Sequence, residues 1–163
     1  MTTCPDRPDE PERPEKGVAL VTGAAGGIGA AVVRRMEAQG YAVAAVDRRE
    51  HSSRRLVAEL EHEGHRAIHY GADVSDGDMV ERVVSKVERG LGGITAVVNV
   101  AGVLHHGTTS KFPAEQWHEL FAVNALGVFD ICRAVSSRMA SRGHGSIVTV
   151  GSDAVAFLGS PGA

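Results

Sequence analysis

A glycine-rich turn is the feature that most constrains how this chain can fold. It reads TGAAGGIG over residues 22–29 and lies between an apolar run, residues 18–22, and a segment in which Ile28, Val32 and Met36 recur every four residues. The run is typical of a buried parallel strand, and the recurrence indicates a helix with one apolar face. The chain must therefore pass from a strand into a helix within a few residues, which glycine, free of a Cβ, permits at low steric cost.

This position also suits the turn to bind a ligand. Without side chains the backbone can approach a pyrophosphate, and the N-terminus of the following helix supplies free N–H groups and the positive end of its dipole. A glycine-rich turn alone is more often an ordinary loop, but the strand–turn–helix context favours dinucleotide binding. The candidate cofactor residues in the turn are Thr22, Gly23, Gly27, Ile28 and Gly29.

Apolar runs and helical periods continue to alternate after the turn, as in a chain of βαβ units. The expected strands cover residues 18–22, 42–46, 67–70, 96–100 and 146–150, with helices between them. Ser75 with Asp78 has the form of a capping box for the helix that follows the third strand. The pattern predicts an α/β fold, a Rossmann-type doubly wound parallel sheet truncated after the fifth strand, with ligands at the carboxyl ends of its strands.

A long apolar stripe precedes the last expected strand. It starts after Pro113, a residue suited to a first helical turn, and its members are Trp117, Leu120, Phe121, Val128, Ile131, Val135 and Met139. Asn124 falls on the same expected helical face, which places an amide among apolar neighbours. Because a buried amide without partners is costly, Asn124 is either a structurally satisfied side chain or a functional one.

Composition and charge narrow the class of protein. Residues 1–16 contain four of the six prolines and no apolar segment, and we expect a disordered tail there, followed by one Rossmann domain over residues 17–163 that is incomplete at its C-terminus. The formal charge of −3 offers no basic field for nucleic acid or an anionic membrane surface. The least polar stretch, residues 18–33, is shorter than a membrane helix requires. Cys4 and Cys132 lack metal-like spacing and fit a reduced, cytoplasmic compartment.

Asp47 ends the second expected strand, 18 residues after Gly29. A carboxylate there can accept hydrogen bonds from both hydroxyls of an adenosine ribose and repels a 2′-phosphate, which favours NAD over NADP. A solvated aspartate at a strand end is an equally good interpretation of Asp47 alone, and the neighbouring Arg48 and Arg49 could tolerate a phosphate.

Five motifs, in this order, resemble those of the short-chain dehydrogenase/reductase family. They are the TGxxxGxG pattern of Gly23, Gly27 and Gly29, the pair Asp73-Val74, the segment NVAG at residues 99–102, Asn124 and Ser152. The resemblance covers the chain from Lys16 onwards and implies an oxidoreductase that moves a hydride between NAD and a small alcohol or ketone. NVAG departs from the usual NNAG at Val100.

For the cofactor, the resemblance implies a role for each matching residue. Asp73 would hydrogen-bond the adenine amino group and Val74 would pack on the ring. Either could equally be an ordinary residue that follows a strand and contacts no ligand. Asn99 would brace the central sheet and border the cofactor. The small residues Ala101 and Gly102 would lie near the adenosine ribose.

For catalysis, the resemblance implies that Asn124 holds a proton-relay water through a helix distortion and that Ser152 hydrogen-bonds the substrate oxygen. The family's proton acceptor is the tyrosine of a Tyr-x-x-x-Lys pair, which counting from Ser152 places beyond Ala163. We therefore expect that the chain as given does not turn over substrate, although a longer parent does. That parent is expected to be a homo-oligomer, a dimer or tetramer. The alternative of another class is a nucleotide-binding module without catalysis.

Within the family, the segments VVNVAGVLHHGTT, FAVNALGVF and SIVTVGSDAVA are similar to the branch that oxidises 2,3-dihydro-2,3-dihydroxybenzoate with NAD in siderophore biosynthesis. His105 stands where that branch carries an arginine, and a protonated histidine could meet the substrate carboxylate. The runner-up is a 3-oxoacyl-carrier-protein reductase or another short-chain reductase. His105 and His106 lack a third ligand at helical spacing, so we expect no metal site.

Overall fold

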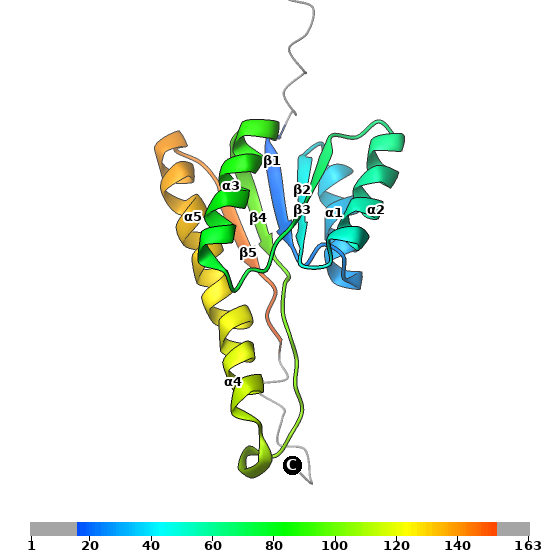
Figure 1. Ribbon diagram of the computed structural model, residues 1–163. Helices are drawn as coiled ribbons and strands as arrows, with labels where there is room; N and C mark the ends of the chain where they lie inside the picture. Colours follow the sequence, from blue (N-terminus) through cyan, green and yellow to red (C-terminus); the bar gives the residue numbers. More distant parts are fainter. Residues whose placement is uncertain (1–15, 153–163) are drawn as a thin grey trace, which may run out of the picture.

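The structure is a computed structural model that describes residues 16–152, and it contains one parallel sheet with helices on both faces (Figure 1). The strands are β1 (Val18–Thr22), β2 (Ala42–Asp47), β3 (Ala67–Gly71), β4 (Ile94–Asn99) and β5 (Ser146–Thr149). The helices are α1 (Gly27–Glu37), α2 (Glu50–His62), α3 (Gly77–Leu91), α4 (Ala114–Phe121) and α5 (Gly127–Arg142), with a 3-10 turn η1 (Thr109–Lys111) and a π-helical turn η2 (Ala122–Leu126). Most of the expected tail, residues 1–15, and the C-terminal residues 153–163 lie outside the described part of the chain.

The sheet has the order β3-β2-β1-β4-β5, and every strand pair in it is parallel. In the central strand β1, Leu20 is level with Ala44 of β2 and Val97 of β4. After β3 the chain returns past β1 to form β4, so the strand order reverses between β1 and β4. In open α/β sheets the crevice outside the carboxyl ends of the strands at such a point is where ligands bind. The predicted doubly wound parallel sheet is confirmed.

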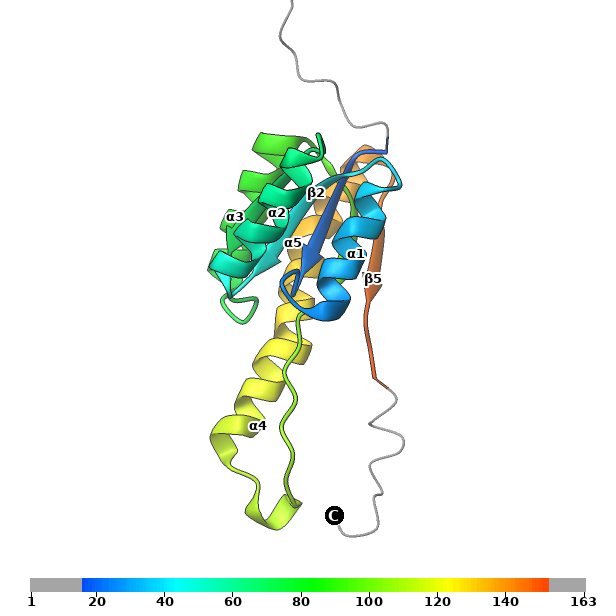
Figure 2. The same cartoon turned by 90° about the vertical axis from the view of Figure 1, so that its right-hand side faces the viewer.

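Small aliphatic side chains form a core on each face of the sheet. Successive residues of β1 point to opposite faces, because side chains alternate along a strand. Leu20 packs in the cluster with residues of α3 and α5, and Val21 packs in the cluster with residues of α1 and α2. Figures 1 and 2 show these two helix layers on either side of the sheet.

The start of α3 differs from the sequence prediction. Asp76 is the N-cap residue, and its Oδ1 accepts a hydrogen bond from the Met79 N–H at 2.9 Å. The Ser75 hydroxyl instead donates to Asp73 Oδ1 at 2.7 Å. The predicted Ser75–Asp78 capping box is therefore wrong, because the turn after β3 uses Ser75 to hold Asp73 and leaves the free N–H groups of the helix to Asp76.

The long stripe after Pro113 is divided by the π-helical turn η2. Ile131 and Met139 of α5 are buried in the core, whereas Trp117 and Phe121 of α4 are 54% and 55% exposed. Figure 1 shows the reason, since α4 extends beyond the carboxyl ends of the strands. A π turn also shifts the helical register, so α4 and α5 do not share one face. The expectation of a single buried stripe is correct for α5 and wrong for α4.

The helical run Ala114–Arg142 is also long and apolar enough, by length and composition alone, to cross a membrane. It has 29 residues, and its most apolar window has a mean hydropathy of 1.4. The expectation that residues 18–33 are the least polar stretch did not include this run. Core helices of soluble proteins pass the same test. Because Ile131, Val135 and Met139 join the core of the sheet, we interpret the second half of the run as a helix packed on the sheet.

The N-cap of α3 gives a first prediction. Asp76→Ala removes the acceptor for the Met79 N–H and should lower the free energy of unfolding by about 1 kcal/mol, the usual cost of losing an N-cap. Urea unfolding followed by circular dichroism measures this loss. Asp78→Ala is the matched control, because Asp78 lies in the same first turn but is not the N-cap residue. With both variants unfolded at high salt, which screens the interaction of a carboxylate with the helix dipole, its loss should be well below about 1 kcal/mol. A loss for Asp78→Ala as large as that for Asp76→Ala would contradict the assignment of the cap.

Candidate functional site

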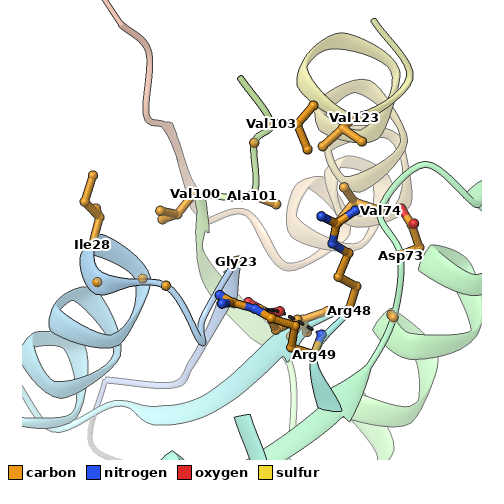
Figure 3. A pocket seen from close by; sticks show the side chains of 17 residues that line it. Gly23, Ile28, Arg48, Arg49, Asp73, Val74, Val100, Ala101, Val103 and Val123 are labelled. Carbon is orange, nitrogen blue, oxygen red and sulfur yellow. Dashed lines mark hydrogen bonds and ion pairs between the residues drawn. The ribbon is translucent and has the colours of Figure 1, made fainter. Parts of the chain in front are cut away.

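A cavity of about 410 Å³ opens at the carboxyl ends of the central strands (Figure 3). Its walls come from the glycine-rich turn, the end of β2, the loop after β3, the segment after β4 and Val123 of η2. Of the residues predicted to bind a cofactor, those that line it are Gly23, Gly27, Ile28, Gly29, Asp47, Asp73, Val74, Ala101 and Gly102. The structure thus brings together residues from four separate segments of the sequence.

The glycines of the turn are required for different reasons. Gly23 has a φ of +64°, and a Cβ on it would lie 2.7 Å from the Ala101 nitrogen. A Cβ on Gly29 would overlap the Gly23 carbonyl oxygen. A Cβ on Gly27, by contrast, would meet no atom of residues 16–152 within 4 Å, although Gly27 borders the cavity. Gly23 and Gly29 are therefore needed by the fold, and Gly27 keeps the cavity wall free of a side chain.

Thr22 and Asn99, both predicted cofactor residues, lie beneath the cavity and not on its wall. The Thr22 Oγ1 accepts hydrogen bonds from the N–H groups of Val100 and Ala101, at 3.1 and 3.2 Å. The Asn99 Nδ2 donates to Thr149 Oγ1 of β5 at 3.3 Å. Both side chains are buried and brace β4 against its neighbours, so they position the cavity wall.

Asp47 is buried at the end of β2 and is bound to the backbone on two sides. Its Oδ2 accepts from the Ala25 N–H at 2.9 Å, and its Oδ1 accepts from the Arg49 N–H at 2.8 Å and from Arg49 Nε at 3.4 Å. The carboxylate therefore ties the glycine-rich turn to β2 in addition to facing the cavity. This bracing role was not part of the sequence prediction.

Arg48 belongs to a group of three ionisable side chains that come from different segments of the sequence. It borders the cavity and extends towards Val74 (Figure 3). The Arg48 Nη1 lies 3.6 Å from Glu119 Oε1, and Glu119 Oε2 lies 2.7 Å from His105 Nε2. His105, the predicted partner of a substrate carboxylate, thus pairs with Glu119 of α4. No sequence signal joined these three residues, which come from different segments.

Asp73 accepts two hydrogen bonds from Ser75, one from its hydroxyl at 2.7 Å and one from its N–H at 2.9 Å. These two bonds, the hydroxyl's being the stronger influence, hold the pKa of the Asp73 carboxyl below its ordinary value against the opposing effect of burial. The positive charge of Arg48 lowers that pKa a little further. Asp73 therefore carries its negative charge at the cavity wall.

Asn124 lies at the centre of η2 and is exposed. Its Nδ2 donates to the Val103 carbonyl and its Oδ1 accepts from the Val103 N–H, both at 2.9 Å. The expected helix distortion is present, but the expected burial among apolar side chains is wrong, because Asn124 precedes the part of the helix that packs on the sheet. The amide is satisfied by the segment after β4.

The remaining candidates lie at the edge of the described chain. Ser152 is exposed and follows β5 by three residues, and the next residues of the GSDA motif lie outside the described range. Val100, the departure from the family pattern, borders the cavity and packs on the core cluster of α1 and α2. Within residues 16–152, the side chains of His, Cys, Asp and Glu form no group of three that could hold a metal ion.

The chain is similar in sequence to known dehydrogenases. The sequence profile described as short chain dehydrogenase matches residues 17–162. The chain is 44% identical over 137 residues to 2,3-dihydro-2,3-dihydroxybenzoate dehydrogenase of Bacillus subtilis, covering 84% of this chain and 52% of that protein. It therefore spans about half the length of this curated relative.

Two solved structures show the same fold in enzymes with different cofactors. NAD⁺-bound xylitol dehydrogenase superimposes with a TM-score of 0.82 and 30% identity, over 90% of this chain and 56% of that one. A gluconate 5-dehydrogenase from Burkholderia cenocepacia, in complex with NADP and tartrate, gives a TM-score of 0.78 and 34% identity, over 84% of this chain and 54% of that one.

The pair of Asp73 and Ser75 gives a prediction for the site. Ser75→Ala removes the hydroxyl that lowers the Asp73 pKa most, so this pKa should rise towards its ordinary value, as measured by NMR titration of the carboxyl carbon. Because the folded-state pKa is lowered, Asp73 contributes stability that is complete above its unfolded-state pKa and is lost as the pH falls through the folded-state pKa. Ser75→Ala should therefore reduce the stability of the protein at neutral pH more than in strong acid. Ser141→Ala, a serine substitution in the last turn of α5 at the opposite end of the sheet (Figure 1), should leave the titration unchanged, and an unchanged titration in Ser75→Ala would refute the assignment.

Proposed function

The chain belongs to the short chain dehydrogenase family, and we propose that it binds NAD in a dehydrogenase that oxidises a cyclic alcohol. The substrate we propose is 2,3-dihydro-2,3-dihydroxybenzoate, which would yield 2,3-dihydroxybenzoate for siderophore biosynthesis. The observation that carries this proposal is the 44% identity to the Bacillus subtilis enzyme of that name over 84% of this chain.

The residues around the cavity fit a dinucleotide. The first turn of α1 borders the cavity and has no side-chain cap, so a pyrophosphate would meet its N–H groups and the positive end of the helix dipole. Gly27 leaves room for such a close approach. Thr22, Gly23 and Gly29 would hold the turn in this shape.

Asp47 supports NAD as the cofactor. Its Oδ2 accepts one hydrogen bond, from the Ala25 N–H, and keeps a lone pair for a ribose hydroxyl. Its Oδ1 accepts from the Arg49 N–H and, at 3.4 Å, from the exposed Arg49 Nε, and a second ribose hydroxyl would replace this longer bond. Because the carboxylate is buried and fixed, a 2′-phosphate next to it would be repelled. Arg48 and Arg49 offset only part of this repulsion, so NADP remains the weaker candidate.

The other candidates have proposed roles at the two ends of the cofactor. Asp73 would accept a hydrogen bond from the adenine amino group, with Val74 against the ring, while Ala101 and Gly102 would face the adenosine ribose. The bound cofactor supplies the acceptor for the hydride that leaves the ring carbinol. Ser152 would hydrogen-bond the carbinol oxygen, and Asn124 would hold a water molecule of the proton path. His105 would reach a substrate carboxylate only after turning away from Glu119.

We also propose that the enzyme is a cytoplasmic homo-oligomer, a dimer or tetramer, that acts on a small molecule without nucleic acid or membrane partners. The charge of −3 supports the last point. Trp117, Phe121 and Phe129 are each more than half exposed on α4 and α5, and they offer an apolar surface for a second subunit.

Asp47→Ala tests the cofactor. Loss of the charged hydrogen bonds should weaken NAD binding by about 1 to 3 kcal/mol and should narrow the difference between the Kd values for NAD and NADP. Calorimetric titration of both nucleotides measures the two values, and their ratio cancels any loss of folded protein. Asp78→Ala, on the exposed side of α3, is the control and should leave both Kd values unchanged. Tighter binding of NADP than of NAD by the unaltered chain would overturn the cofactor assignment.

The substrate is tested with the protein expressed from its full open reading frame. Formation of NADH with 2,3-dihydro-2,3-dihydroxybenzoate should give a kcat/KM about 10²-fold or more above that for the reduction of a 3-oxoacyl thioester. Ser152→Ala should lower kcat by about 10²- to 10³-fold, because a donor to the charged oxygen of the transition state is lost. Ser141→Ala on α5 is the control. Faster turnover of the thioester would favour the carrier-protein reductase instead.

A further inference from the structure

We propose that the first turn of α5 positions the adenine side of the cavity and that Gly127 is its positioning residue. The inference rests on the proposed function, because it takes the cavity to hold a dinucleotide. Gly127 does not border the main cavity, but Val74, which does, stands directly against it. Gly127 would therefore act on the cofactor only through Val74.

The contact between Gly127 and Val74 leaves no room for a side chain. A Cβ on Gly127 would lie 2.8 Å from Val74 Cγ2 and 3.1 Å from the Val74 carbonyl oxygen. The Val74 side chain is buried, and its branched Cβ makes rotation about χ1 unfavourable. The crevice that Val74, Val123 and Gly127 share has no space for a water molecule. A methyl group at position 127 would therefore displace the backbone of the loop after β3.

Helix geometry does not explain the glycine. Gly127 has a φ of −59°, which any residue adopts, and glycine inside a helix is less favourable than alanine. Among the described residues, it is the close approach of Val74 that requires a glycine at position 127.

The same side of α5 also holds the far end of this loop. Asp130 follows Gly127 by three positions, so the two residues share a helix face. The buried Asp130 Oδ2 would lie 2.8 Å from a Cβ on Gly77, the first residue of α3. α5 thus contacts the loop at residue 74 and again at residue 77, and this fixes the segment between them.

The loop after β3 forms part of the cavity wall. Its residues Asp73 and Val74 lie on the same side of the cavity as Val123 (Figure 3). Val74 lies between Gly127 and the cavity, so a loop pushed away from α5 moves into the space proposed for adenine. The Asp73 carboxylate would move with it. The adenosine half of the cofactor should therefore lose affinity, while the glycine-rich turn stays in place.

The test is a double-mutant cycle on the purified chain, with ADP-ribose as the probe and calorimetry as the readout. Gly127→Ala should weaken ADP-ribose binding about tenfold, which corresponds to about 1.4 kcal/mol and lies in the range for overpacking. The double variant Val74→Ala with Gly127→Ala should bind ADP-ribose about as tightly as Val74→Ala alone. The truncation removes Cγ2, the contact at 2.8 Å, and leaves the contacts at 3.1 Å with Cβ and the carbonyl oxygen, which a small shift relieves. The folded fraction of each variant is measured by urea unfolding, and binding is expressed per folded molecule.

Gly90→Ala is the matched control. Gly90 also lies inside a helix, but a Cβ there would make an ordinary contact, 3.8 Å from Ile68 Cδ1. It should leave ADP-ribose binding unchanged and should not lower the urea midpoint.

The outcomes separate the two proposals. If the unaltered chain binds neither NAD nor ADP-ribose, the proposed function fails and the inference fails with it. If the unaltered chain binds and folded Gly127→Ala binds equally well, only the inference is overturned. If Gly127→Ala does not fold, the double variant decides. Binding equal to that of Val74→Ala supports the inference, and binding about tenfold weaker overturns it.

Discussion

The structure depends on the close backbone approach between the glycine-rich turn and the end of β4. Gly23 lies so near Ala101 that no side chain fits between them, and the Thr22 hydroxyl accepts hydrogen bonds from the two N–H groups that follow β4. On the other side, Asp47 binds the Ala25 N–H from the end of β2. The turn is thus held between both neighbours of β1. Because the strand order reverses at this place, the cavity opens directly above the turn.

The features that depend on residues adjacent in the sequence could be predicted from it. Strands buried on both faces read as continuous apolar runs, and β1 and β2 were recognised on that ground within one residue of their observed bounds. The glycine turn could be assigned because its meaning depends on the strand before it and the helix after it, both adjacent in sequence. Asp47 could be placed near the turn because parallel strands end at the same edge of the sheet, whereas Asp73 was implied by the resemblance to the family.

The rest could not be predicted because it depends on distances between elements. Glu119 meets Arg48 and His105 only after α4 has been placed beyond the end of the sheet, and no period in the sequence encodes that position. The choice of Asp76 over Ser75 as the N-cap depended on a competing hydrogen bond to Asp73. Gly127 reads as an ordinary helical glycine until Val74 is seen against it.

The π-helical turn connects the two ends of the cavity. Val123 contributes to the cavity wall, Asn124 binds both backbone groups of Val103, and Gly127 receives Val74. Val123 and Gly127 border the same crevice as Val74, whereas Asn124 bonds to the segment after β4. The π turn and the first residue of α5 therefore contact the loop after β3 and the segment after β4 together. A shift of this turn would move both the cavity wall proposed to contact adenine, at Val74, and the amide proposed for catalysis, Asn124. The π turn therefore fixes the positions of these two parts of the site relative to each other.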